Sequence, residues 1–267
     1  MKLLRHGLVG LASLLLLVAL LLWFLPARWA MPWLQPRLRG LQLQHVGGTL
    51  WDGHAGQLLG VDKRPLGQLQ WRLSRRALLG RRELWLRLDG PRLAFSGDLR
   101  QRDDGRIEAH ALSVRAEASA LQPYLKSSLG QPRGELVLSV DHLLLQGGWP
   151  MELQGRARWE HAQVHTREGD VELGTVLLLA QADDGVVQAS WHDEGHGPLQ
   201  VQGRLQISPL GWRLDAALRA RHTDPPLQRW LARLGPASAD GGVHIQYHGG
   251  LAGSVPAPSP EKDTTPP

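Results

Sequence analysis

From Leu41 onward, apolar and polar residues alternate along much of the chain. The alternation is clearest in Leu41–Gln44, Leu69–Leu73, Leu84–Leu88 and Leu199–Gln202. Because successive side chains of a β-strand point to opposite faces, a period of two predicts strands with one buried and one solvated face. Short clusters that suit hairpin connections separate these stretches: Asp89-Gly90-Pro91, Asp103-Asp104-Gly105, Gly147-Gly148, Asp183-Asp184-Gly185 and Gly195-His196-Gly197-Pro198. We therefore predict a mainly β, antiparallel domain, built as a curved sheet or a sandwich.

The N-terminus carries a long apolar run. Leu8–Leu25 is a stretch of 18 residues without a charge, which is long enough to cross the hydrocarbon core of a bilayer. Lys2 and Arg5 precede it, and Pro26–Ala30 follows it with bulky and charged side chains where a signal peptide carries small residues for cleavage. We expect a single uncleaved transmembrane helix, with residues 1–7 in the cytoplasm and the main domain outside it. Three tryptophans are expected near the lipid headgroups: Trp23, Trp29 and Trp33.

Two later stretches have the spacing of a short amphipathic helix. The first begins at Ser119, ends at Gly130 and has Leu121, Leu125 and Leu129 on one face. The second begins at Asp224-Pro225 and ends before Gly235, and its apolar face consists of Leu227, Trp230, Leu231 and Leu234. Helices this short are stable only when packed, so both are expected to bury these faces.

A fixed offset relates the two halves of the chain. Six pairs of identical residues are 106 positions apart: Gly97/Gly203, Leu99/Leu205, Gly105/Gly211, Leu121/Leu227, Gln122/Gln228 and Leu125/Leu231. An offset of this kind predicts an internal duplication. The predicted organisation is a transmembrane helix (8–25), a linker (26–40), a first β-repeat (41–147), a second β-repeat (148–253) and a proline-rich tail (254–267), with one short helix per repeat. The tail has too few apolar groups to fold.

Composition excludes several classes of function. The formal net charge is +5, but the basic residues are interleaved with Asp and Glu instead of forming blocks, which argues against a nucleic-acid-binding face. The chain has no cysteine, so it has no disulfide, thiolate metal site or cysteine nucleophile.

No set of residues has the spacing of a known catalytic site. Neither a nucleophile elbow nor a glycine-rich phosphate loop occurs between a strand and a helix. His161 and His165 are four residues apart in sequence that predicts a strand, where this spacing does not converge on a metal, and His192 and His196 fall in a predicted turn. We therefore predict no enzymatic activity, no cofactor and no metal site.

Two segments are more specific than the alternation. The first, Gly48–Ala55, reads Gly-Thr-Leu-Trp-Asp-Gly-His-Ala, and the second, Leu69–Gly80, begins Leu-Gln-Trp-Arg-Leu. In this order, after an N-terminal anchor, they resemble the N protein of the bacterial type II secretion system. Many relatives have a proline after the second segment's Trp-Arg-Leu, where this chain has Ser74-Arg75-Arg76. We call Gly48, Thr49, Leu50, Trp51 and Gly53 the tryptophan box, and Leu69, Trp71 and Leu73 the tryptophan strand.

The resemblance implies a non-catalytic accessory component of the bacterial inner membrane. Such a protein would support the export of folded proteins from the periplasm, in contact with the secretin or the inner-membrane platform. No catalytic residue comes with the resemblance. The tryptophan box has two interpretations: Gly48 and Gly53 suit a tight turn or bulge that holds an indole against a neighbouring strand, or Trp51 binds a partner.

A different function is compatible with the same alternation. A long β-repeat can form an open curved sheet whose apolar face carries lipid, as in AsmA-like proteins, because a lipid groove and a closed core need the same pattern of Leu, Val and Trp. A third and weaker hypothesis is a periplasmic hydrolase.

Overall fold

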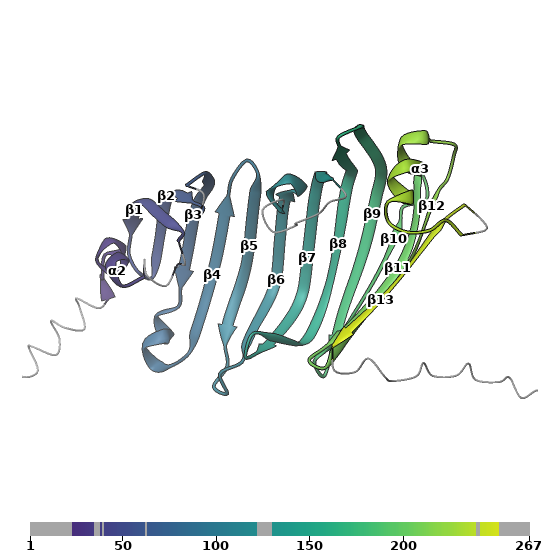
Figure 1. The fold of residues 1–267 in the computed structure, drawn as a ribbon. Helices are drawn as coiled ribbons and strands as arrows, with labels where there is room; N and C mark the ends of the chain where they lie inside the picture. The colour runs from purple at the N-terminus through teal and green to yellow at the C-terminus, as the bar shows by residue number, and fades with distance from the viewer. Residues whose placement is uncertain are drawn as a thin grey trace, which may run out of the picture.

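The computed structural model describes residues 23–34, 38, 40–61, 63–121, 130–238 and 241–250. Within these ranges, every strand belongs to one antiparallel sheet of 13 strands, and spatial order follows sequence order from β1 to β13 (Figure 1). The mainly β, antiparallel prediction is confirmed, and of the two architectures considered, the open sheet is correct and the sandwich is not.

The first six strands form the N-terminal half of the sheet, which begins after a short helix, α2 (Ala27–Leu34). The strands are β1 (Gln42–Gly48), β2 (Asp52–Leu59), β3 (Pro65–Leu73), β4 (Arg82–Asp89), β5 (Leu93–Gln101) and β6 (Ile107–Glu117). A 3-10 turn, η2 (Arg75–Leu79), follows β3; Ser74 caps its start and Gly80, with φ 91°, ends it.

The remaining strands are longer in the middle of the sheet. They are β7 (Gln131–Gln146), β8 (Trp149–Thr166), β9 (Gly169–Asp183), β10 (Val186–Asp193), β11 (Leu199–Ser208), β12 (Gly211–Ala220) and β13 (Val243–Gly250). A 3-10 turn, η3 (Ala118–Leu121), follows β6, and helix α3 (Pro225–Ala232) joins β12 to β13. All five predicted glycine and aspartate clusters lie at connections between strands.

The second predicted helix is confirmed as α3. The carboxylate of Asp224 accepts a hydrogen bond from the backbone N–H of Leu227 at 3.2 Å, and proline occupies the first turn. This is the N-cap geometry that the sequence indicates. Leu227, Trp230 and Leu231 are buried against the sheet. The first predicted helix falls mainly on residues 122–129, which lie outside the described residues; only its start, in η3, is described.

The predicted membrane helix also lies almost entirely outside the described residues, as do residues 1–7 and the proline-rich tail. Among the helices that are described, none is long and apolar enough to cross a membrane. The stretch predicted as a linker, 26–40, contains α2. Trp23 and Trp29, expected at the headgroups, are 49% and 57% exposed.

The offset between the two halves reappears in the strands. When 106 is added to the residue numbers of β5, the range becomes 199–207, which matches β11 (Leu199–Ser208). The same shift places β2, β3, β4 and β6 on β8, β9, β10 and β12, respectively. A close backbone contact also recurs. Gly90 packs on Gly67 between β3 and β4, and Gly197 packs on Gly174 between β9 and β10, at positions where a Cβ atom would meet backbone atoms at less than 3.0 Å. Both halves therefore need glycine at the same kind of crossing.

Candidate functional site: the apolar face and its two covers

One continuous row of apolar residues crosses the whole sheet. Each member is paired with the next across neighbouring strands, from β1 to β13. In order they are Val46, Ala55, Leu69, Leu88, Phe95, Val114, Leu138, Ala157, Leu178, Trp191, Gly203, Ala216 and Ile245. Directly opposed residues lie on one side of a sheet, so this row defines what we call the apolar face.

The neighbouring row has the opposite character. It consists of Gly47, His54, Gln70, Arg87, Ser96, Ser113, Ser139, Arg156, Leu179, Ser190, Arg204, Asp215 and Gln246, again one residue per strand. Because adjacent residues of a strand point to opposite sides, this row lies on the other face, which we call the polar face. The alternation read from the sequence therefore continues, in register, across all of the described strands.

The two ends of the apolar face are covered by helices. At the N-terminal end, Ala27 of α2 is fully buried against Ala55 and Trp71, with Leu69 and Leu86 among the side chains packed around them. At the C-terminal end, the buried face of α3 packs on a larger cluster that includes Val201 of β11 and Val243 of β13. Figure 1 shows the two helices at opposite ends of the sheet.

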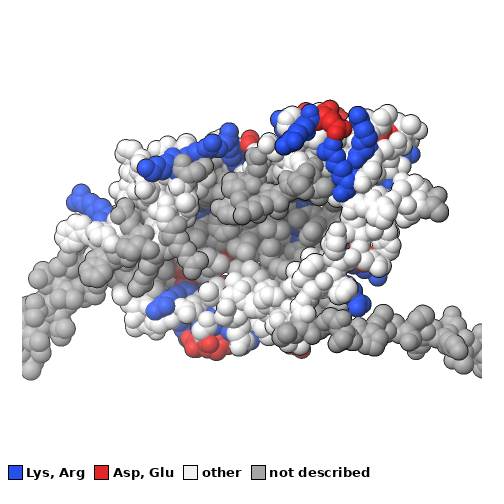
Figure 2. Space-filling model, in the orientation of Figure 1, with Lys and Arg blue, Asp and Glu red and all other residues white. Residues whose placement is uncertain are grey.

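Between these covers the apolar face is more open. Leu138, at the middle of the row on β7, is 36% exposed, whereas Ala55 and Leu88 near one end are 1% and 6% exposed, and Ala216 near the other is 5% exposed. The space-filling view shows Lys and Arg side chains gathered along the upper edge of the near face (Figure 2).

The tryptophan box forms the turn between β1 and β2. Within it, the backbone N–H of Thr49 donates to the carbonyl of Asp52 at 2.8 Å, and the N–H of Asp52 donates to the Thr49 hydroxyl at 3.0 Å. The box also holds the segment before α2: the N–H of Leu50 donates to the carbonyl of Leu25 at 2.9 Å, and Thr49 forms an isolated β-bridge with Pro26. The box thus fixes where the chain enters the sheet.

The box and the tryptophan strand are joined through Trp71. Its indole N–H donates to the carbonyl of Leu50 at 3.1 Å, and its ring lies over Gly53, the residue directly opposite, where a Cβ atom would be less than 3.0 Å from the ring. Trp71 is 9% exposed, and Trp51, whose carbonyl accepts from the N–H of Leu73, is 4% exposed. The structure therefore brings the predicted residues together, and the indole that the glycine accommodates is that of Trp71.

The polar face carries ionised carboxylates in hydrogen-bonded pairs. A hydrogen bond from the Arg102 guanidinium lowers the pKa of Glu108, and a hydrogen bond from His244 lowers the pKa of Asp215. A group whose pKa is lowered stays charged at neutral pH, so neither carboxyl is poised to donate a proton. These pairs account for the two carboxylates without a catalytic role.

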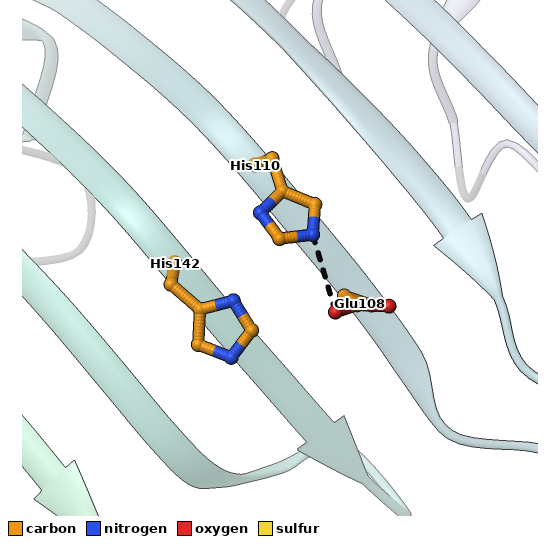
Figure 3. Close-up of side chains that lie close together, drawn as sticks. All are labelled: Glu108, His110 and His142. Carbon is orange, nitrogen blue, oxygen red and sulfur yellow. Dashed lines mark ion pairs between the residues drawn. The ribbon is translucent and has the colours of Figure 1, made fainter.

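Sequence inspection missed one cluster on this face. Glu108, His110 and His142 offer ligand atoms that all lie within 4.8 Å of one another, and they come from β6 and β7 (Figure 3). It is the one group of three or more such side chains found in the described part of the chain. The histidines considered from the sequence lie elsewhere: His165 contacts Asp170, and His161 sits at a position with φ 50° in β8. A cross-strand pair so far apart in sequence leaves no local spacing signal.

Comparison with known proteins identifies the family. The family model described as type II secretion system (T2SS), protein N, matches residues 39–246, which include the tryptophan box, the tryptophan strand and most of the sheet. The chain belongs to the type II secretion system protein N family. A curated type II secretion system protein N from Aeromonas hydrophila is 26% identical over 215 residues, which cover 78% of this chain and 84% of the relative. No solved structure matches.

Membership in the protein N family ties the chain to type II secretion and to protein transport. The match begins after the apolar N-terminal run, so it rests on the sheet and not on the predicted anchor. The resemblance inferred from the two tryptophan segments is therefore confirmed over the greater part of the chain.

Proposed function

We propose that this chain is a non-catalytic, membrane-anchored component of type II secretion whose apolar face binds another component of the same machine. In this proposal Leu8–Leu25 spans the bacterial inner membrane, the N-terminus is cytoplasmic, and the sheet is periplasmic. The partner is the secretin or a protein of the inner-membrane platform. No cofactor takes part, and the chain supports the export of folded proteins by holding these components together.

The observation that carries the proposal is the row of apolar residues, which continues from one edge of the sheet to the other. Two helices cover its ends, and Leu138 in its middle is 36% exposed. Contiguous apolar surface of this kind on a folded protein marks a binding site for protein, lipid or membrane. In a secretion component, another protein of the assembly is the occupant most consistent with family membership.

The position of the tryptophan box supports the anchored arrangement. The box bonds to Leu25 and Pro26, the last residues before α2; Leu25 ends the apolar run and Pro26 follows it directly. A transmembrane helix ending here would hold the β1 edge of the sheet near the membrane. We propose that the box residues act structurally, by fixing this entry, and that the apolar face provides the contact with the partner.

Export by a strain that lacks the gene tests this function. We expect deletion to block type II export of folded exoproteins and the wild-type gene to restore it. Leu138→Asp should restore export poorly, because a charge in the middle of the apolar face opposes docking. Ser139→Asp is the matched control, since Ser139 neighbours Leu138 in sequence and belongs to the polar row. Equal export by both variants, at equal abundance, would contradict the proposal.

A second candidate function is lipid carriage on the same face. The observation in its favour is the openness of the sheet: the apolar row reaches both edge strands, β1 and β13, as a surface that guides an acyl chain would require. Lipid mass spectrometry of the purified chain tests it. Phospholipid at a fixed ratio in wild type that is lost in Leu138→Asp would favour this candidate over a protein partner.

We further infer that the sheet arose by duplication of a unit that corresponds to 41–147 and 148–253. The recurrence of five strands at an offset of 106 and the repeated glycine crossings support this inference. Superposition of the two halves in an experimental structure, strand by strand, is the test, and an unrelated course of β2–β6 and β8–β12 would contradict it.

A further inference from the structure

Three potential metal ligands lie together on the polar face at the middle of the sheet, and a fourth, Glu152, contacts one of them. His110 of β6 is directly opposite His142 of β7, and their ring centroids are 5.1 Å apart. Glu108 lies two residues before His110 on β6, and Glu152 lies on β8. Leu144 of β7 is the cross-strand partner of both glutamates, so the two carboxylates flank a single buried leucine. Figure 3 shows the two imidazole rings side by side above their strands, with Glu108 close to His110.

Irregularities in two strands put the histidines on this face. From Ser113 to His110, β6 takes three residues where β5 takes two. One of the residues in this stretch, Ala111, has φ 49°. Opposite it, β7 carries an extra residue relative to β8 between Val140 and His142. Without these bulges the alternation would place both imidazoles on the apolar face. Bulges re-aim side chains, and a non-glycine residue at positive φ is a conformation that proteins retain mainly where surrounding structure requires it.

The contacts within the cluster are already close to those of a metal site. Glu108 Oε1 lies 3.2 Å from His110 Nε2, and Glu152 Oε2 lies 3.0 Å from His142 Nε2. Two ligands of a tetrahedral Zn²⁺ ion, each at about 2.0–2.1 Å, are about 3.3 Å apart. Each histidine–glutamate pair therefore has the required separation, and only the distance between the pairs must shorten. His110 and Glu152 have side chains that are 51% and 52% exposed, so they have room to move and an open path for an ion.

The charge of the cluster also suits a cation. Arg102 donates to both carboxylate oxygens of Glu108, at 3.0 and 3.1 Å, and fixes its orientation. With two carboxylates and one guanidinium, the group is negative overall when the histidines are neutral. Imidazole nitrogen and carboxylate oxygen together favour Zn²⁺ and neighbouring first-row divalent ions over Ca²⁺ and Mg²⁺, which prefer oxygen ligands alone.

We propose that Glu108, His110 and His142 bind a divalent first-row transition-metal ion, with Glu152 as the fourth ligand, and that the ion ties β6, β7 and β8 together at the centre of the sheet. The site is separate from the proposed docking function, because it lies on the opposite face. Its consequence is structural: an ion held by three strands stabilises the region where the two halves of the sheet join.

Isothermal titration of the full chain, purified in detergent micelles without a polyhistidine tag, tests this site with Zn²⁺ as the probe. Wild type should bind one Zn²⁺ saturably, and the melting temperature should rise with Zn²⁺ but not with Mg²⁺. His142→Ala should weaken binding by more than about tenfold, since even partners outside the ligand shell typically cost about 10–100-fold in affinity. Glu152→Gln should weaken it by less.

His192→Ala is the matched control, because His192 is an exposed histidine on β10 and lies outside the cluster. It should bind Zn²⁺ as wild type does. Far-ultraviolet circular dichroism in the absence of metal shows whether His142→Ala keeps the fold; if it does not, His110→Gln serves as the second ligand variant. Binding that is unchanged in His142→Ala and His110→Gln, or equal binding of Mg²⁺ and Zn²⁺, would overturn the proposal.

Discussion

The apolar face is covered by a different kind of helix contact at each end of the sheet. At the N-terminal end, α2 contributes one fully buried alanine and has Pro32 inside it, and the tryptophan box bonds to the segment just before this helix. At the C-terminal end, α3 is capped by Asp224 and buries Leu227, Trp230 and Leu231 in the larger apolar cluster. One cover is attached through the backbone and a single indole, and the other is packed as part of a core.

Because of this difference, we expect the two ends to owe their stability to different contacts. Burial of apolar side chains supplies most of the stability of a packed element. At the C-terminal end this burial is shared among many side chains. The N-terminal end depends on Trp71, which joins β3, the box and α2. In the proposed arrangement that end also receives the membrane anchor.

The largest effect on stability is expected at the N-terminal end, from replacement of Trp71. Trp71→Ala removes the ring that covers Gly53 and the bond to Leu50, and should lower the free energy of unfolding by about 3–5 kcal/mol. Urea unfolding followed by circular dichroism measures it. Trp29→Ala is the control, because Trp29 lies on α2 but is 57% exposed, and it should change stability little. Equal effects would mean that the indole of Trp71 is not what holds this cover.

At the C-terminal end, Leu227→Ala should cost about 2–5 kcal/mol, because Leu227 is fully buried and its removal leaves a cavity between α3 and the sheet. The measurement is again urea unfolding, with Leu210→Ala as the control, since Leu210 is 62% exposed at the turn between β11 and β12. A loss below 1 kcal/mol would show that α3 is not part of a packed core, and the contrast between the ends would fail.

A smaller effect concerns the turns that follow β4 and β10. Burial by itself would raise the pKa of Asp193, but the N–H groups of Val201 and Gly195 and the Arg221 guanidinium lower it overall. Because the folded pKa lies below the ordinary value of 3.8, the carboxylate stabilises the fold above pH 3.8, and this contribution is lost as the pH falls through the folded pKa.

The corresponding variant is Asp193→Asn. It should be less stable than wild type by about 1–3 kcal/mol at pH 7, since it weakens charged hydrogen bonds, and the difference should shrink below pH 3.8. Asp89→Asn is the control at the equivalent turn, where the aspartate is exposed and pairs only with Arg87 among the ion pairs of the described residues. A pH-independent difference for Asp193→Asn would assign its effect to packing instead of charge.

The smallest effect tests the helix cap. Asp224→Ala should cost about 0.5–2 kcal/mol, because the N–H of Leu227 loses its acceptor, and Asp224→Asn should restore most of this loss. Thermal unfolding of the three proteins measures it. No difference between Asp224→Ala and wild type would mean that packing alone holds α3 in place.

Much of this architecture could be predicted from residues whose effect is local. Alternation indicated β1, β3, β4 and β11, and turn glycines and aspartates indicated the hairpins, because both depend on neighbours in the chain. Asp224 and Pro225 indicated α3 for the same reason. Helix α2 was not predicted, since Pro32 and Pro36 favour a linker over a helix.

Features that depend on distant strands could not be predicted. An open sheet and a sandwich require the same alternation, so the sequence left both possible. The histidine pair was missed because His110 and His142 lie on different strands, and because bulges at Ala111 and beside His142 reverse the face that simple alternation assigns to them. The sequence also did not show that the indole over Gly53 belongs to Trp71. These two residues face each other only because of the register between β2 and β3.

Site-specific photo-crosslinking in living cells tests the central claim, that the middle of the apolar face is a docking surface. A photoreactive phenylalanine analogue is placed at Leu138 in one strain and at Ser139 in another, which directs it to opposite faces of β7. The account predicts an adduct with the secretin or a platform protein from position 138 and little or none from position 139. Equal adducts from both positions, or only phospholipid adducts at 138, would contradict it.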